Sequence, residues 1–172
     1  YTDNIVQHEY VNSATQKNWA IPQVETDWIM VLDADERVSD ALRDRIQTIL
    51  KDGTDYDGFY VKRLTKFFGK PIKHCGWGSE YLVRFWRKGK GMYLDRSVHA
   101  DVKVEGKTGR IEEHIVHDTY KNYDDYFEKF NRYTTWSAQD LYKKGASAGV
   151  LNLVMRPIWR FFKMYFLQLG FL

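Results

Sequence analysis

An unbroken apolar segment that ends in acidic residues constrains this chain most strongly. Residues 28–32 are all apolar, and Asp33, Asp35 and Glu36 follow almost at once. A short continuous run of this kind is typical of a strand buried within an α/β sheet, and we expect a central parallel strand here. Open α/β sheets form their ligand sites beyond the carboxyl ends of such strands. The sequence therefore predicts an α/β fold with a polar site at the end of this strand.

Strand-like and helix-like patterns alternate around this segment. A first helix is expected over residues 12–20, and a second from Ser39, a favourable N-cap, to Gly53, a favourable terminator. The expected inner face of the second helix consists of Leu42, Ile46, Ile49 and Leu50. Further strands are expected over residues 58–64, 81–87, 98–104 and 111–116, with a turn over 66–71.

The last third of the chain has a helical pattern. It begins at Asn122 and resumes after a linker of small residues, 145–149, to continue to about Leu169. We therefore expect an α/β domain over residues 1–121, with mixed strands and flanking helices, and a helical extension over residues 122–172.

The acidic strand end has a specific chemical use. Residues two apart in an extended chain point the same way, so Asp33 and Asp35 can converge on one cation. Carboxylate oxygens suit Mg²⁺ or Mn²⁺, which commonly bridge substrate phosphates and neutralise the charge of a leaving diphosphate. Three interpretations stay open from these residues alone. They are a solvated acidic loop, an Asp-x-Asp phosphatase, and a glycosyltransferase metal site. Against the phosphatase, Arg37 occupies a position where that motif carries Thr or Val.

Several segments, in order, resemble the family-2 glycosyltransferases, and most closely their lipopolysaccharide-core glucosyltransferase-like branch. These segments are residues 16–22, 27–36, 76–77, 80–87, 98–99 and 156–172. The resemblance implies a GT-A fold and an inverting transfer of a sugar from a nucleotide-sugar donor to a lipid-linked or cell-envelope glycan acceptor. The family's opening strand units, which shape much of its nucleotide pocket, are not in this sequence, so we expect an incomplete catalytic domain.

The same resemblance implies roles for individual residues. Asp33 and Asp35 would contact the metal and diphosphate, with Lys17 and Asn18 near the donor. Glu80 occupies the position of the base that takes the proton of the attacking acceptor hydroxyl, where the family more often carries Asp. The other interpretation of Glu80 is a surface carboxylate that caps a loop. Further candidates for donor or substrate binding are Trp77, Arg84, His99 and His117, each of which also has an ordinary structural interpretation.

The C-terminal segment combines cations with aromatic rings. Its cations recur at helical spacing, and basic residues interrupt the apolar run before it reaches the ~18 residues of a transmembrane span. This pattern predicts an interfacial helix on an anionic membrane surface, although a helix packed on the domain is the alternative. The residues expected to contact the membrane are Arg156, Trp159, Arg160, Phe162 and Lys163.

The charge distribution and the single cysteine limit the partners and the compartment. Five of the 26 basic residues and no acidic residue lie after Leu141, so the other 21 basic residues are balanced by 23 acidic ones. This balance argues against a nucleic-acid binder with a broad basic face. Cys75 has no partner for a disulfide, as expected in a reducing compartment. We expect a cytoplasmic protein, peripheral on the inner face of the plasma membrane. The alternative from another class is a non-catalytic membrane-associated binding module with the same fold.

Overall fold

The computed structural model describes residues 4–78, 80–94 and 101–172. The chain forms two compact units. The first unit comprises residues up to Ala34 together with Val38–Lys62 and Tyr81–His114. The second unit comprises Asp35–Arg37, Arg63–Glu80 and Ile115–Leu172.

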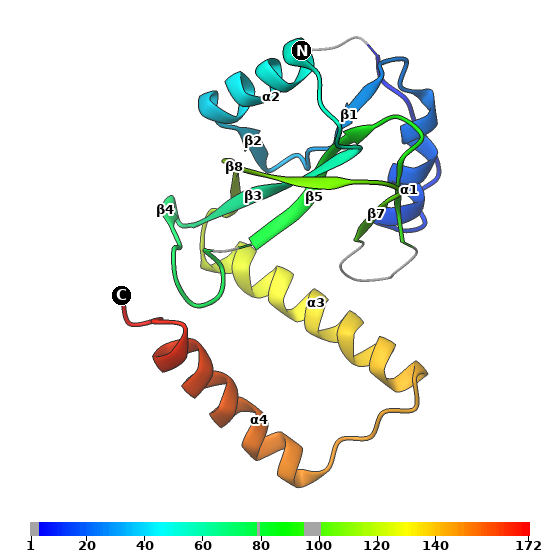
Figure 1. Ribbon diagram of the computed structural model, residues 1–172. Coiled ribbons are helices and arrows are strands. Elements are labelled where there is room, and N and C mark those ends of the chain that lie inside the picture. Colours follow the sequence, from blue (N-terminus) through cyan, green and yellow to red (C-terminus); the bar gives the residue numbers. More distant parts are fainter. Residues whose placement is uncertain (1–3, 79, 95–100) are drawn as a thin grey trace. The chain divides into compact units, whose positions relative to one another are not determined.

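Most strands form one six-stranded sheet in the order β1-β5-β3-β8-β2, with β4 paired to β3 (Figure 1). Its strands are β1 (Trp28–Met30), β2 (Glu36–Val38), β3 (Gly58–Phe67), β4 (Lys70–Pro71), β5 (Glu80–Arg87) and β8 (Thr108–Tyr120). A second, two-stranded sheet pairs β6 (Gly91–Tyr93) with β7 (Val102–Val104). The mixed sheet with flanking helices is GT-A-like and confirms the predicted fold class.

The prediction of a central parallel strand at residues 28–32 was wrong. β1 lies at one end of the strand order and pairs antiparallel with β5, with Ile29 opposite Trp86. Its apolar character comes from contacts on both faces of the strand. Ile29 is buried with Trp86 on one face, while the Trp28 ring stacks on the Phe85 ring with centroids 4.6 Å apart. An end strand covered on both faces therefore has the same continuous apolar pattern as a central one.

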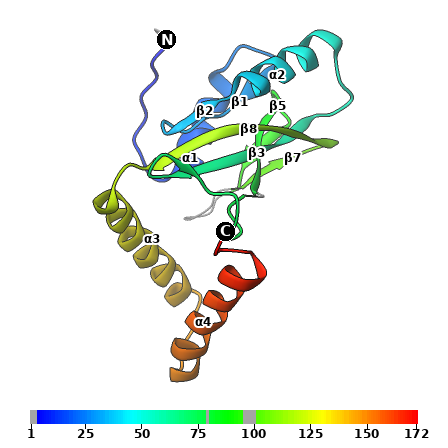
Figure 2. The ribbon, with the colours of Figure 1, turned by 90° about the vertical axis from the view of Figure 1, so that its left-hand side faces the viewer.

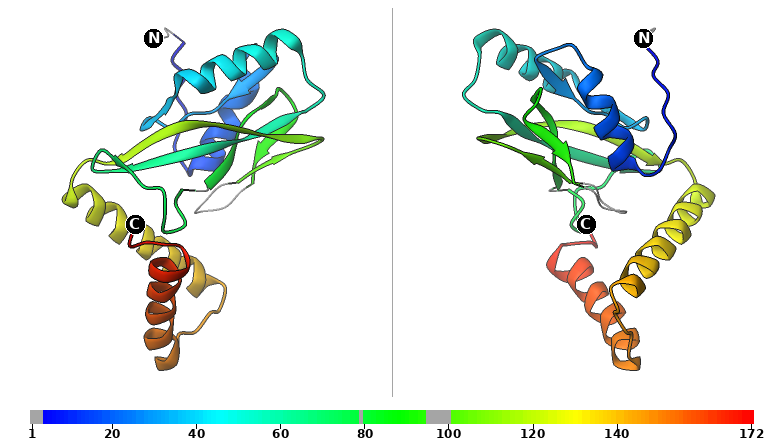
Figure 3. Two further views of the ribbon diagram at one scale, coloured as in Figure 1. Left: turned by 60° about the vertical axis from the view of Figure 1, so that its left-hand side comes forward. Right: turned by 90° about the vertical axis from the view of Figure 1, so that its right-hand side faces the viewer.

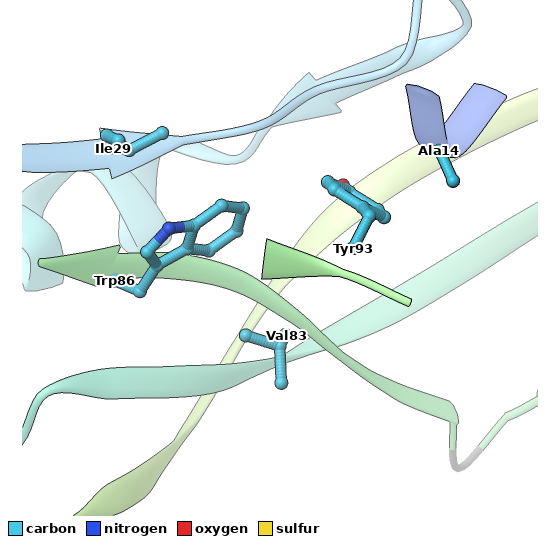
Figure 4. Close-up of a cluster of buried hydrophobic side chains, with 5 residues drawn as sticks. All are labelled: Ala14, Ile29, Val83, Trp86 and Tyr93. Atoms are coloured by element: carbon cyan, nitrogen blue, oxygen red, sulfur yellow. The ribbon is translucent and has the colours of Figure 1, made fainter. Parts of the chain in front are cut away.

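The core of the first unit joins helix α1 (Ser13–Ala20) to the neighbouring strands. Ala14 of α1 is buried with residues of β1, β5 and β6, and Figure 4 shows how they lie: Ala14, Ile29, Val83, Trp86 and Tyr93. Asn12 and Thr15 close the start of α1 with a reciprocal capping box, and the 3₁₀ turn η1 (Ile21–Gln23) follows α1. This packing fixes the helix that carries Lys17 and Asn18.

Helix α2 (Asp40–Asp52) confirms the predicted caps but has a narrower inner face. The Ser39 hydroxyl accepts from the Leu42 N–H at 3.2 Å, and Gly53 ends the helix at a φ of 77°. Leu42 and Ile49 are buried, whereas half of Leu50 is exposed to solvent. The prediction of Leu50 as an inward residue was wrong, because it lies one step around the helix from Ile49.

In the second unit, β3 and β4 form a tight hairpin within the predicted turn. β3 continues to Phe67, which pairs with Lys70, and Phe68 and Gly69 make the turn at φ values of 50° and 77°. β8 is likewise longer than its predicted core of 111–116. Of the strand predicted over 98–104, β7 covers Val102–Val104, and residues 98–100 lie outside the described part of the chain.

Helix α3 (Tyr123–Lys143), α4 (Val150–Phe162) and the π-helical turn η2 (Lys163–Leu167) complete the second unit. The Asn122 side chain accepts from the Asp125 N–H at 2.8 Å, which confirms the predicted start of α3. The end of the chain lies beside the loop after β4, as Figures 2 and 3 show, and Cys75 N donates to Gln168 O at 2.9 Å. A separate domain over residues 122–172 stays a prediction.

Candidate donor and metal site

In the first unit, the Asp33 carboxylate lies between two cations. The Lys17 ammonium is 2.6 Å from Oδ1, and Nη2 of Arg84 is 2.7 Å from Oδ2. Lys17 comes from α1 and Arg84 from β5, and the Val31 N–H donates to the Arg84 carbonyl at 3.0 Å just after β1. The structure thus brings together three of the predicted site residues, from α1, from β5 and from the segment after β1.

Tyr93 of β6 completes this group. The Asn18 side chain forms two hydrogen bonds of 2.9 Å with the backbone N–H and carbonyl of Tyr93. The Lys17 ammonium lies 5.1 Å from the centre of the Tyr93 ring, and Arg84 Nη1 lies 3.5 Å from its hydroxyl. Asn18 therefore fastens α1 to β6. Sequence reasoning missed Tyr93, because nothing in the residues around it indicates a partner so far along the chain.

The cations determine the ionisation of Asp33. Partial burial raises the pKa of this carboxyl, but the Lys17 hydrogen bond and the charges of Arg84 and Lys17 outweigh it and lower the pKa to about 2. Asp33 is therefore a carboxylate at neutral pH.

In the second unit, Asp35 lies near a different pair of basic groups. Its Oδ2 is 3.5 Å from Nε2 of His117 on β8 and 3.9 Å from the Lys129 ammonium on α3. The Asp118 N–H donates to the Asp35 carbonyl at 3.0 Å and ties this backbone to β8. Lys129 also donates to the Thr119 carbonyl at 2.7 Å. Lys129 was not predicted, because it belongs to a helix whose charges resemble an ordinary solvated face.

Glu80, the predicted base, lies in a network with Arg63 and Glu36. Arg63 Nε and Nη2 donate to Oε2 of Glu80 at 2.9 and 2.6 Å. The same guanidinium lies 3.7 Å from the Glu36 carboxylate, whose side chain is fully buried. Neither Arg63 nor Glu36 was predicted as a site residue, although Glu36 continues the acidic segment.

Trp77 lies in an aromatic cluster of the second unit. Its ring centroid is 6.4 Å from those of Phe67 and Tyr120, and the ring is half-buried. These contacts orient the ring, and a role in sugar stacking stays a prediction. His99 lies outside the described residues.

The carboxylate oxygens of the acidic segment suit a metal ion that is also bound by the phosphates of a substrate. Within residues 4–78, 80–94 and 101–172, no group of three or more His, Cys, Asp and Glu side chains could hold a metal ion. The acidic segment nevertheless supplies hard carboxylate oxygens, and Asp35 keeps about a third of its side chain exposed. Mg²⁺ and Mn²⁺ are often bound by one or two carboxylates plus substrate phosphates, so the residues fit such a metal.

The helices of the second unit expose an unusual amount of apolar surface. On α4, Trp159 is 60% exposed and Phe162 is 44% exposed. Arg156 and Arg160 are exposed too, whereas Lys163 is half-buried. α3 adds exposed rings, namely Tyr123, Phe127, Phe130, Tyr133 and Trp136. Among the described residues, no helix is long and apolar enough to cross a membrane.

Comparison with known proteins shows which proteins this chain is similar to. The chain is 28% identical over 155 residues to the lipopolysaccharide core biosynthesis glycosyltransferase LpsC of Rhizobium meliloti. This match covers 89% of this chain and 57% of that protein. The chain is related to glycosyltransferases. It is also 23% identical to the uncharacterized glycosyltransferase RT0209 of Rickettsia typhi, and 24% identical to an uncharacterized glycosyltransferase of Rickettsia felis. Those two matches cover 95% of this chain and 60% and 62% of the relatives.

These relatives confirm the resemblance to glycosyltransferases that the sequence motifs indicated. No family model matches the chain. The chain spans about three fifths of the length of the curated relatives, at 57%, 60% and 62%. We therefore state the activity of the whole protein as a proposal.

Proposed function

We propose that the protein is an inverting glycosyltransferase that moves a sugar from a nucleotide-sugar donor to a lipid-linked or cell-envelope glycan. The observation that carries this proposal is the similarity to a lipopolysaccharide core biosynthesis glycosyltransferase over 89% of the chain. The fold class and the acidic residues at the end of β1 agree with it. The phosphatase alternative has no comparable support among the relatives.

We assign the metal to the acidic segment after β1, with Asp35 as the leading ligand and Asp33 as its partner in the motif. A bound Mg²⁺ or Mn²⁺ would neutralise the charge that grows on the leaving diphosphate. Lys17 and Arg84 hold Asp33 in its charged form, and His117 and Lys129 lie beside Asp35. Asp33 already has two close cations, so we give Asp35 the greater part in metal binding.

Glu80 is the proposed base. It takes the proton of the acceptor hydroxyl, the acceptor oxygen bonds to the anomeric carbon, and the bond from that carbon to the diphosphate breaks. The electron pair of that bond leaves with the nucleoside diphosphate. More than a third of the Glu80 side chain is exposed, which leaves it accessible to an acceptor.

An assay of sugar transfer by the full-length protein tests whether it is a glycosyltransferase. Donors such as UDP-glucose, UDP-galactose and GDP-mannose are incubated with a lipopolysaccharide core acceptor and Mn²⁺, and the glycan product is measured by mass spectrometry. We expect transfer by the wild type, loss of transfer in Asp35→Asn, and unchanged transfer in the control Asp124→Asn at the exposed start of α3. If the protein is instead a non-catalytic binding module, no donor gives a glycan product. If it is a phosphatase, the assay releases inorganic phosphate and no glycan product.

We also propose that α4 attaches the protein to the cytoplasmic face of the plasma membrane, near a lipid-linked acceptor. Exposed aromatic rings beside Arg156 and Arg160, in a segment without acidic residues, support this partner. Replacing Arg156, Arg160 and Lys163 by Gln removes about 1 kcal/mol of attraction per residue, so we expect roughly 100-fold weaker binding to anionic vesicles. Vesicle flotation measures this effect, with Lys51→Gln, Lys62→Gln and Lys70→Gln as a charge-matched control. Equal binding of the two triple variants would exclude the α4 surface.

A further inference from the structure

Arg63 joins two carboxylates that differ sharply in their surroundings. The Glu36 side chain on β2 is fully buried, whereas that of Glu80 at the start of β5 is 38% exposed. Arg63 on β3 lies between them, with Nη1 3.7 Å from Oε1 of Glu36 and Nη2 2.6 Å from Oε2 of Glu80. All three residues belong to the second unit, and they stand on β2, β3 and β5, so hydrogen-bonded strands hold their backbones.

The buried end of this network fixes the guanidinium. A carboxylate that is removed from water is costly unless a cation lies close by, so Glu36 restrains Arg63 from the protein side. The guanidinium is planar and its donors point in fixed directions. Two of these donors, Nε and Nη2, reach the same oxygen of Glu80. Arg63 therefore engages Oε2 and determines where Oε1 lies.

We propose that Arg63 is a positioning residue for the base of the reaction, with Glu36 as its buried anchor. It holds Oε2 of Glu80, so that Oε1 accepts the proton of the acceptor hydroxyl. The acceptor oxygen then bonds to the anomeric carbon as the nucleoside diphosphate departs with its electron pair. This inference rests on the proposed function and adds to it a residue that neither the motifs nor the relatives identify.

Replacing Arg63 by Lys separates positioning from simple charge balance. Lys keeps the positive charge that Glu36 requires, but it cannot present two fixed donors to one oxygen. With saturating Mn²⁺ and donor, we expect kcat of Arg63→Lys to fall at least about 10-fold, because an oriented general base contributes about 10²–10⁴-fold. The KM for the donor should stay within about twofold. Arg63→Met should lose as much kcat and also unfold at a lower temperature.

Arg43→Lys is the matched control, because Arg43 also pairs with two carboxylates, Asp40 and Asp44, but on the exposed face of α2. Its kcat should equal that of the wild type. A wild-type kcat in Arg63→Lys would overturn the positioning role while Asp35→Asn and Glu80→Gln remain inactive. Full turnover in Asp35→Asn and Glu80→Gln would instead overturn the proposed function, and the role of Arg63 with it.

Discussion

Asp33 and Asp35 are equally exposed, with 37% and 36% of their side-chain surfaces accessible, yet the protein holds them differently. Asp33 makes two close ion pairs, at 2.6 and 2.7 Å, with Lys17 and Arg84 of the first unit. Asp35 lies at 3.5 and 3.9 Å from His117 and Lys129 of the second unit. Exposure therefore does not distinguish the two carboxylates, but the distance to the nearest basic side chains does.

This difference suggests that the two carboxylates of the acidic segment have different roles. A carboxylate in two short charge-assisted hydrogen bonds has most of its binding capacity committed to the protein. At 3.5 Å and beyond, an ion pair is longer than a good hydrogen bond and is easily exchanged for a metal or a water. We expect Asp33 to act chiefly in stability and Asp35 chiefly in metal binding.

Metal affinity should show the largest contrast. In Asp35→Asn, the affinity for Mn²⁺ in the presence of UDP should fall about 100-fold or more, since the metal loses a charged ligand. Asp33→Asn should lower it by a smaller factor, because Lys17 and Arg84 already occupy that carboxylate. Isothermal titration calorimetry measures both variants. An equal loss of Mn²⁺ affinity in the two variants would contradict the proposal that Asp35 has the greater part in metal binding.

Folding stability should show the reverse order. Asp33→Asn removes the carboxylate that lies 2.7 Å from Nη2 of Arg84, whose side chain is 7% exposed. We expect this variant to lose about 1–2 kcal/mol of unfolding free energy, within the range for hydrogen bonds to charged groups. Asp35→Asn should lose less than about 0.5 kcal/mol, because its ion pairs are long and partly exposed. Urea denaturation compares them, and a larger loss in Asp35→Asn would contradict the comparison.

The smallest effect should be the response to acid. The pKa of Asp33 is lowered from 3.8 to about 2, so its stabilising contribution is complete above pH 4 and is lost as the pH falls through 2. Because more than a third of the side chain is exposed, solvent screening limits this contribution to about 1 kcal/mol. The difference in urea midpoint between wild type and Asp33→Asn should therefore narrow from pH 5 to pH 2. A difference that stays constant would show that the charge of Asp33 does not matter.

Local chemistry explains which features the sequence predicted well. Asn12, Ser39 and Asn122 cap helices through bonds to residues three positions ahead, so their patterns are visible in a short window. The place of β1 in the sheet depends instead on its pairing with β5, which lies far along the chain. The apolar run alone cannot distinguish an end strand packed on both faces from a central one.

The site residues show the same difference between features that are visible in the sequence and features that depend on the fold. Lys17 was named from a family resemblance, Asp33 also from the acidic strand end and Arg84 from its place on a strand, and the structure brings the three together. Arg63 and Lys129 were missed, because each gains its significance from a carboxylate on another element. In the sequence, both are ordinary surface cations on a strand and on a helix. Only the fold shows that they lie beside Glu80 and Asp35.

The most direct test of the central claim is the configuration of the product formed by the complete chain. Proton NMR of the transferred sugar is recorded with Mn²⁺, after chelation by EDTA, and in Asp35→Asn. We predict a β-linked product from an α-linked donor with Mn²⁺, and no product with EDTA or in the variant. An α-linked product, or undiminished transfer by Asp35→Asn, would contradict an inverting, metal-assisted transfer at this acidic segment.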